Sequence, residues 1–411
     1  MLNRYLNPQK RCKFVHNGFI IFIQTLLIIF ATQVGIGLIC ARAEAVSYTP
    51  TVHAKSAVLV DFGGGQVLYS LNPNMKLPPA SITKIMTMLL TMEGIDAKQI
   101  SLSDTVRTSA HAASIGGSQI WLKEGEELPL ESMLKAIAIV SANDASTAVA
   151  EFVAGSEEDF VKMMNRRAHE LGMKDTHFVN PDGLPAPDHY STAYDIAIMA
   201  RELLKHPKVL EWTSKWIENI PRPAVPEGVY PLKNTNALIQ RYPGADGLKT
   251  GMTEEAGYCL VGTAKRNGAR LISVVLGTDS DEARLTETIK LLNYGFRNFA
   301  SVHIISKGQE AGKVRVPGGV KEMVTVVAAD DLSVFVEKGK EQMIDKTVKS
   351  VERQAPVKKG EKIGVLEVNL EKKKLGEVDL LSTEDVGRAN FVVRIIRAIR
   401  DFFKGLFGLG R

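Results

Sequence analysis

The chain has 411 residues, of which 45% are hydrophobic, 24% charged and 7% aromatic. These fractions are typical of a globular protein and exclude collagen-like, low-complexity and wholly disordered chains, and the length indicates two or three domains. The formal net charge is +5, and residues 1–43 and 388–411 carry +5 each, so the body between them carries about −5. This mildly acidic body lacks the basic footprint of a nucleic-acid-binding protein, and no nucleic-acid partner is expected.

The first 43 residues have the layout of a secretory signal. Basic residues between Arg4 and Lys13 precede a stretch without formal charge from Phe14 to Ala41. Small residues then offer two A-x-A cleavage sites, Ala41-Arg42-Ala43 and Ala43-Glu44-Ala45. We predict that residues 1–43 are a cleaved signal peptide. The alternative is an uncleaved span, because the apolar run is long enough to cross a bilayer. Either way, the body lies outside the cytoplasm.

The body begins with an expected hairpin and a helix that carries a reactive pattern. Residues 57–62 and 66–70 look extended and flank a Gly-Gly-Gly turn. The helix is expected to follow Pro78-Pro79, to run to about Glu93 and to stop at Gly94. Near its start, the i, i+3 spacing of Ser81 and Lys84 places an amine beside a hydroxyl. A desolvated lysine can take a serine's proton, and a helix N-terminus favours a developing oxyanion. Alone this pattern is weak, since composition gives roughly one S-x-x-K by chance.

A second pattern stands between helices. Helices are expected over residues 129–140, 144–154, 157–171 and 192–205. Between the first two lies Ser141-Ala142-Asn143, which offers a hydroxyl for proton relay and an amide that can bind a substrate amide. The alternative is that Ser141 or Asn143 merely caps the helix that begins near Asp144.

A third pattern opens a region of strands. The cation and hydroxyl of Lys249-Thr250-Gly251 are what a substrate carboxylate needs, and the glycine allows close approach. Residues 258–265 and 270–277 then flank Asn267-Gly268, the strongest short hairpin signal. A helix over residues 281–299 closes this unit. Strands at both ends with helices between them predict an α+β domain.

The pattern of apolar and polar residues changes twice in the remaining sequence. Residues 301–385 consist of short alternating apolar runs separated by turn residues, which predicts a small all-β sandwich or barrel. From Phe391 to Phe407, apolar residues recur at helical spacing with three arginines and a lysine on the opposite side. We expect residues 388–411 to form an amphipathic helix in a membrane interface; the alternative is a helix docked on the protein's own core.

Together, in this order, the three motifs are those of serine penicillin-recognising enzymes. Longer stretches strengthen the resemblance: LNPNMKLPPASITKIMT, SANDASTAVAE, FVNPDGLPAPDHYSTAYDIAIMA and GADGLKTGMTEEAGYCLVGTAKRNGARLISVVLG. The chain resembles the type-5 D-alanyl-D-alanine carboxypeptidases, which are low-molecular-mass penicillin-binding proteins of the S11 serine peptidase family. The match covers residues 45–300 or so, and the later part of the chain fits the family more loosely.

The resemblance implies an α+β, penicillin-recognising transpeptidase/β-lactamase-like fold, with a five-stranded antiparallel sheet between helical layers. On this basis the catalytic domain would span residues 44–300 and a β-rich C-terminal domain residues 301–387. Residues 388–411 would then hold the exported enzyme peripherally on the outer face of the cytoplasmic membrane.

The resemblance also implies a reaction. Ser81 would attack the carbonyl between the last two D-alanines of a peptidoglycan stem pentapeptide, with Lys84 as the general base. Ser141 would pass the proton to the leaving D-alanine, and water would release the shortened peptide from the acyl-Ser81 intermediate. β-Lactam antibiotics, which mimic D-Ala-D-Ala, would leave a long-lived acyl group on Ser81. No metal or other cofactor is expected.

Five further residues are implied in binding. Asn143 would hold the amide of the acyl chain, and Lys249 and Thr250 would hold the terminal carboxylate. Gly251 would allow the substrate to approach the strand. The backbone N–H of Met252 would complete an oxyanion hole with that of the nucleophilic serine.

Other functions stay open. A class A β-lactamase would need a glutamate to activate the deacylating water, and the loop over residues 180–191 contains none. A D,D-endopeptidase and a catalytically silent penicillin-binding or cell-wall module are further alternatives. A zinc peptidase is disfavoured because three histidines, expected at loop or surface positions, lack metal-ligand spacing: His169, His177 and His189. Three aspartates are explained by turns and helix caps: Asp182, Asp188 and Asp195.

Overall fold

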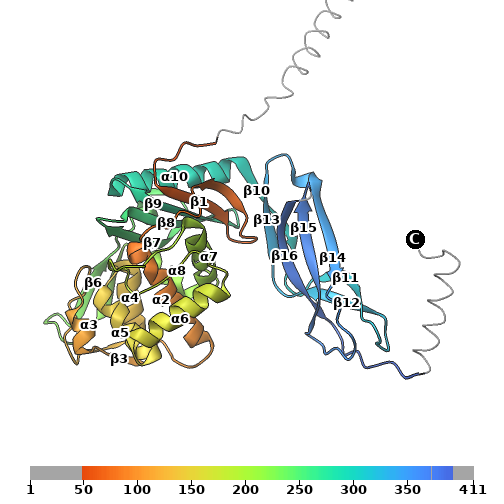
Figure 1. Ribbon diagram of the computed structural model, residues 1–411, viewed down its shortest axis with the longest axis horizontal. Coiled ribbons are helices and arrows are strands. Elements are labelled where there is room, and N and C mark those ends of the chain that lie inside the picture. Colours follow the sequence, from red (N-terminus) through yellow and green to blue (C-terminus); the bar gives the residue numbers. More distant parts are fainter. Residues whose placement is uncertain (1–48, 372, 392–411) are drawn as a thin grey trace, which may run out of the picture. The chain divides into compact units, whose positions relative to one another are not determined.

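Figure 1 shows the computed structural model, which describes residues 49–371 and 373–391. The predicted signal peptide over residues 1–43 and most of the predicted helix over residues 388–411 lie outside the described residues. In the ranges that are described, no helix is both long enough and apolar enough to cross a membrane.

The first part of the described chain is built on a five-stranded antiparallel sheet. Its strands lie in the order β2-β1-β9-β8-β7, so that β7 is an edge strand. Their bounds are β1 (Ser56–Asp61), β2 (Val67–Leu71), β7 (Ala245–Thr253), β8 (Gly257–Arg266) and β9 (Ala269–Thr278). The two predicted hairpins are confirmed. At the second, Asn267 and Gly268 have φ values of 49° and 79°, as a tight turn between twisted strands requires.

Helices cover both faces of this sheet (Figure 1). Alternate residues of β1 serve the two faces: Ala57 and Leu59 lie in one buried cluster, and Val58 and Val60 in another. The first cluster includes residues of α10 (Asp281–Asn298), and the second includes residues of α2 (Lys84–Asp96) and α7 (Ala193–Leu203). The predicted α+β class is therefore confirmed.

The other elements of this part are helices and two-stranded ladders. They are η1 (Ala80–Thr83), β3 (Thr105–Arg107), α3 (Ala110–Ser114), β4 (Glu127–Pro129), α4 (Leu130–Ile139), α5 (Asn143–Ala154), α6 (Glu157–Glu170), α8 (Lys208–Thr213), β5 (Ile217–Pro221), β6 (Val229–Lys233) and α9 (Leu238–Arg241). Within the described residues, each helix that the sequence predicted begins and ends within two residues of its expected bounds, with one exception.

The exception is the helix that carries Ser81. It begins with the η1 turn rather than as an α-helix, and it continues past Gly94 to Asp96. Gly94 does not end the helix because it keeps a helical conformation; Lys98, with φ 57°, takes the left-handed position just beyond the end. The Gln99 N–H then bonds the Gly94 carbonyl oxygen, which closes the last turn.

The later part of the described chain forms a separate all-β domain, as predicted. A two-stranded sheet of β10 (Phe299–Ile305) and β13 (Leu332–Glu337) shares one apolar core with a five-stranded antiparallel sheet. The larger sheet has the order β11 (Glu310–Arg315), β12 (Met323–Ala328), β16 (Lys373–Ser382), β15 (Lys362–Leu370) and β14 (Ile344–Ser350), and the short η2 (Glu341–Met343) precedes β14. Two sheets around one core make this domain a β-sandwich.

Candidate active site

Ser81 and Lys84 meet where η1 passes into α2. The Lys84 Nζ lies 3.0 Å from the Ser81 Oγ. The same nitrogen donates to the Asn143 Oδ1 at 2.6 Å and to the Asp182 carbonyl oxygen at 2.6 Å. Lys84 thus links the first motif to the second and to the loop that follows α6.

Lys84 is fully buried, although its side chain carries an amine. Burial lowers the pKa of Lys84 to about 8, against the opposing influence of the Asp182 and Asp144 carboxylates. The free-energy cost of burying the charged form of the amine is therefore the main influence on the pKa of Lys84. At neutral pH about a tenth of the molecules carry the neutral amine, which is the form that can accept a proton.

Ser141 and Lys249 form a second pair. The Lys249 Nζ donates to the Ser141 Oγ at 2.8 Å and to the Thr250 carbonyl oxygen at 2.9 Å. Lys249 is buried, and its pKa lies well below the usual value, first because of burial and then because of the positive charges of Lys84 and Arg284. Ser141 has a φ of 64°, so the chain holds it in a strained conformation between α4 and α5.

Asn143 is fixed at both ends of its amide. Its Oδ1 accepts from Lys84, and its Nδ2 donates to the Gly116 carbonyl oxygen at 2.7 Å. The backbone N–H of Asn143 bonds the Ser118 carbonyl oxygen. The N-cap of α5 is Ala142, without a side-chain bond. The simple capping role considered for Ser141 and Asn143 is therefore wrong, and both side chains serve buried contacts with lysines.

The third motif lies on the edge strand β7. The Thr250 Oγ1 lies 2.7 Å from the Thr235 Oγ1, and Met252 is 55% exposed. A Cβ at Gly251 would lie 3.1 Å from the Pro79 carbonyl oxygen, so the glycine lets β7 approach the segment before Ser81.

The turn before Ser81 is strained and tightly enclosed. Ala80 has a φ of 48°, which is rare for a residue with a side chain. Gly183, with φ 86°, passes so close that a Cβ there would overlap the Ala80 carbonyl oxygen. The loop after α6 thus lies in direct contact with the backbone immediately before Ser81.

His189 also belongs to this region; it lies in a loop, as expected, but its side chain is buried. It is 6% exposed, and its Nε2 lies 2.9 Å from the Thr83 Oγ1. The Thr83 hydroxyl donates to the Ala80 carbonyl oxygen, so its oxygen must accept a hydrogen bond from the Nε2–H of His189. The Val179 N–H bonds the Nδ1 at 3.1 Å, which completes a neutral tautomer. Burial, and next the charge of nearby His177, lower the pKa of His189 to about 4.

Sequence reasoning missed several contributors to the site. Asp182 contributes its backbone carbonyl, and Arg284 of α10 donates to the Gly251 carbonyl oxygen at 3.0 Å. The buried Asp144 carboxylate accepts from the backbone N–H of Leu122 at 3.0 Å and anchors the loop next to Asn143. These residues belong to no short motif. In the sequence, Asp182 and Asp144 could be interpreted only as a turn residue and a residue at the start of a helix.

Two protein-family models match the chain. The model described as D-alanyl-D-alanine carboxypeptidase matches residues 43–280. The model described as penicillin-binding protein 5, C-terminal domain, matches residues 299–388. The first match covers the α+β part up to the start of α10, and the second covers the β-sandwich.

Individual proteins give the same result. The D-alanyl-D-alanine carboxypeptidase DacF of Bacillus subtilis is 44% identical over 353 residues, which cover 85% of this chain and 90% of that protein. Penicillin-binding protein 5 from Haemophilus influenzae is structurally similar, with a TM-score of 0.70 and 31% identity, over 83% of this chain and 99% of that one. Penicillin-binding protein D2 from Listeria monocytogenes, solved with ampicillin bound, has a TM-score of 0.54 and 33% identity over 61% of this chain and 100% of its own.

Proposed function

The chain belongs to the D-alanyl-D-alanine carboxypeptidase family of serine peptidases, and from this premise we propose how its residues remove the terminal D-alanine from a peptidoglycan stem peptide. The activity of the family is a serine-type hydrolysis, and the family binds β-lactams. The proposal concerns the part that each residue plays.

The three partners of Lys84 carry the proposal for acylation. A neutral amine has two N–H bonds and one lone pair. Its two N–H bonds fit the Asn143 Oδ1 and the Asp182 carbonyl oxygen, which leaves the lone pair for the hydroxyl of Ser81. The Ser81 Oγ then attacks the carbonyl carbon of the penultimate D-alanine while its proton passes to the Lys84 Nζ.

The negative charge that develops on the carbonyl oxygen of the substrate needs hydrogen-bond donors. The backbone N–H groups of Ser81 and Met252 form the oxyanion hole in this proposal. The terminal carboxylate of the substrate binds at Lys249 and Thr250, and the acyl-chain amide binds the side chain of Asn143. Support comes from the fixed positions of these side chains, each of which has a hydrogen-bond partner within 3.0 Å.

The leaving group needs a proton when the C–N bond breaks. Ser141 relays the proton that Lys84 accepted to the amine of the departing D-alanine. The Lys249 Nζ donates to the Ser141 Oγ and so leaves the hydroxyl hydrogen free to point at the leaving nitrogen. Water then attacks the Ser81 ester, which releases the shortened peptide and restores the serine. With a β-lactam, the same attack opens the ring and leaves an acyl group on Ser81.

We further propose that the protein is exported and held on the outer face of the cytoplasmic membrane. The charge-free run from Phe14 to Ala41 supports export, and the one-sided basic pattern of residues 388–411 supports attachment in the membrane interface.

Intact-protein mass spectrometry of the full chain with benzylpenicillin tests this proposal, with the Ser81→Ala variant as the control. The same preparations are assayed for D-alanine release from an acyl-D-Ala-D-Ala peptide. We expect a penicilloyl adduct and D-alanine release in the wild type, and neither in the variant. An adduct that survives in the Ser81→Ala variant would contradict the assignment of the nucleophile.

The other outcomes separate the alternatives. An adduct without D-alanine release would indicate an endopeptidase that needs cross-linked substrate, or a silent binding module. Rapid turnover of penicillin without a lasting adduct would indicate a β-lactamase. Neither an adduct nor turnover in folded protein would overturn the proposed site.

A further inference from the structure

The loop over residues 116–122, between α3 and β4, lies against the amide of Asn143. The Gly116 carbonyl oxygen accepts from the Asn143 Nδ2 at 2.7 Å, and the Ser118 carbonyl oxygen accepts from the Asn143 backbone N–H at 2.7 Å. A Cβ at Gly117 would lie 2.7 Å from the same Nδ2. The position of the 116–122 loop therefore decides which way the Asn143 side chain points.

The backbone of the 116–122 loop is strained at Trp121. This residue has a φ of 61°, which is rare for a bulky side chain, and it is 68% exposed. So exposed an indole buries little apolar surface that could offset the strain. A strained backbone persists only where the surrounding contacts determine its conformation. Contacts to the backbone around Trp121 must therefore hold the loop in place.

Buried charged side chains supply these contacts through both kinds of backbone group. The Asp144 carboxylate accepts from the backbone N–H of Ile120 at 3.2 Å and from that of Leu122 at 3.0 Å. Arg222 donates to the Ile120 carbonyl oxygen and, through its Nη2 at 2.7 Å, to the Trp121 carbonyl oxygen. Asp144 is the neighbour of Asn143 in sequence, but Arg222 lies 102 residues beyond Ile120. The loop thus depends on a side chain from a distant part of the chain.

The guanidinium group of Arg222 is itself fixed in place. Its Nε and Nη2 donate to the two carboxylate oxygens of Glu126 at 2.7 and 2.9 Å, and the two side chains are only 4% and 7% exposed. Its Cζ lies 5.0 Å from the ring centre of Tyr230 on β6, and its backbone N–H bonds the Gly228 carbonyl oxygen. Desolvation offsets much of the attraction in a buried ion pair, so the pair contributes fixed geometry more than stability.

We propose that Arg222 is a positioning residue for acylation: through the loop it holds the amide of Asn143 in the orientation that Lys84 requires. The Gly116 carbonyl oxygen keeps the Nδ2 of this amide on its own side, so that the Oδ1 faces the amine. If the loop moved, the amide could turn and present its NH₂ group to the amine, which needs an acceptor there. The lone pair of the amine would then no longer be directed at the nucleophile. This role rests on the proposed function, because it takes the parts played by Asn143 and Lys84 from it.

Hydrogen exchange of the full chain tests the hold on the loop without any reaction. The double variant Arg222→Met, Glu126→Gln removes both charges together, because a buried carboxylate left without its partner would destabilise the fold. We expect the backbone N–H groups of Ile120, Leu122 and Asn143 to exchange about tenfold faster in this variant, since all three bonds depend on the position of the loop. Mass spectrometry of the peptides that cover these residues measures the exchange, and peptides from the β-sandwich should keep the wild-type rate.

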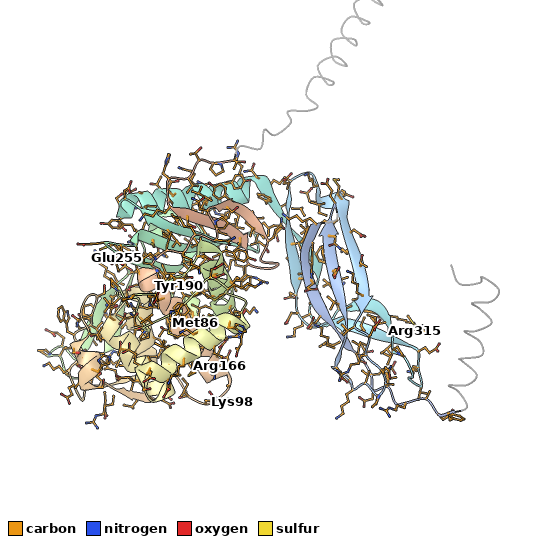
Figure 2. All side chains as sticks on the ribbon, in the orientation of Figure 1. Met86, Lys98, Arg166, Tyr190, Glu255 and Arg315 are labelled. Atoms are coloured by element: carbon orange, nitrogen blue, oxygen red, sulfur yellow. The ribbon has the colours of Figure 1, made fainter. Side chains whose placement is uncertain are left out.

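Arg167→Met is the matched control. Arg167 lies on α6, where Figure 2 labels the neighbouring Arg166, and it pairs with Glu93 of α2 at 2.7 Å. Among the described residues its ion-pair partners are glutamates of α2, α6 and α7, and none belongs to the 116–122 loop. This variant should lose some stability but keep the wild-type exchange in the loop and the wild-type acylation rate.

The acylation rate tests whether the hold on the loop acts through Asn143. The first-order rate constant at saturating benzylpenicillin describes the folded protein and does not depend on how much of it is folded. We expect this constant to fall at least about tenfold in the double variant, as a misplaced contact in an active site allows. Asn143→Ala removes the amide, so adding the double variant to it should cause no further loss.

The outcomes separate this role from the proposed function. Wild-type exchange in the 116–122 loop or a wild-type acylation rate in the double variant would overturn the role of Arg222 and leave the function intact. A further loss of the same size in the Asn143→Ala background would also overturn it, because Arg222 would then act elsewhere. If the wild type forms no acyl-enzyme and releases no D-alanine, but the double variant exchanges faster in the loop and at Asn143, the proposed function fails and the hold of Arg222 on the amide stands.

Discussion

The buried amine of Lys84 connects the geometry of the site to a measurable pH dependence. Because burial lowers its pKa to about 8, the neutral form increases with pH and approaches completeness above that value. We expect the second-order rate constant for acylation of Ser81 by benzylpenicillin to rise nearly tenfold per pH unit below about pH 7.5 and to level off above about pH 9. Stopped-flow or quenched mass spectrometry over this range measures it.

A Lys84→Met variant is the control for this profile. Methionine has a similar length and no base, so acylation should be lost at every pH rather than shifted. A flat profile in the wild type between about pH 6 and 9 would mean that the neutral amine is not the base.

His189 is expected to act on the rate through the turn that presents the serine. Its Nε2 bonds the Thr83 hydroxyl, which in turn bonds the carbonyl of the strained Ala80. We expect His189→Ala to slow acylation by benzylpenicillin about tenfold, because the loss of a buried hydrogen bond costs about 1–1.5 kcal/mol and loosens the turn. The acylation rate is measured together with the melting temperature.

Two controls isolate that effect. His177→Ala removes an exposed histidine from the same region, whose Nδ1 contacts the Asp188 carbonyl oxygen at 2.8 Å, and should leave the acylation rate near that of the wild type. Thr83→Val removes the other partner. If His189 acts through Thr83, the double variant should be no slower than either single one. Additive losses would place the action of His189 elsewhere.

At the scale of elements, sequence patterns predicted the helices and turns whose conformation depends on residues close together in the chain. Asn267-Gly268 predicted its hairpin because two adjacent residues supply the positive φ angles of the turn. The predicted end of α2 was wrong because a glycine stops a helix only when it takes the left-handed position. Here Lys98 takes that position. The placement of β1 beside β9 joins strands far apart in sequence, so no local pattern could indicate it.

The contact between the loop after α6 and the turn before Ser81 gives a prediction at this scale. Gly183→Ala would place a Cβ against the Ala80 carbonyl oxygen, so the loop or the turn must move. We expect a loss of about 3 kcal/mol or more in unfolding free energy, from backbone strain and overlap together, and slower acylation of the protein that remains folded. Urea denaturation and the benzylpenicillin rate measure the two effects.

Gly172→Ala is the matched control. Gly172 has a φ of 78°, similar to the 86° of Gly183, but nothing lies within 4 Å of a Cβ there. This variant should lose only about 1–2 kcal/mol of unfolding free energy, from backbone strain alone, and its acylation rate should be unchanged. Equal losses at the two positions would show that the close approach to Ala80 contributes nothing.

At the scale of the whole molecule, the site joins segments that are distant in sequence. Ser81, Ser141 and Lys249, to which we assign the reaction in our proposal, could be singled out from the sequence because they stand in short recurring motifs. Asp182 contributes a carbonyl oxygen to Lys84, which any residue could supply, so its identity carried no signal. Arg284 donates to the backbone of Gly251 from α10, a contact that exists only after the sheet has formed.

The proposed membrane attachment leads to a prediction about where the chain can be cut. The last described residues belong to the β-sandwich: the Ala389 N–H bonds the Gly318 carbonyl oxygen at 2.9 Å, and the Arg388 Nε bonds the Ala355 carbonyl oxygen at 3.0 Å. Deleting residues 392–411 should therefore release the mature protein into the soluble fraction without changing its melting temperature.

Deleting residues 388–411 should release the protein as well, but it also removes both of these hydrogen bonds. We expect this shorter form to unfold at a lower temperature, by a few degrees for about 1–2 kcal/mol. A third form keeps the full length and carries Ile395→Asp and Phe403→Asp, which break the apolar stripe but keep every basic residue of the tail. If the stripe rather than charge alone holds the protein, this form is soluble too. Retention of the 392–411 deletion in the membrane fraction, after cleavage of the leader has been verified by N-terminal sequencing, would contradict attachment through the tail.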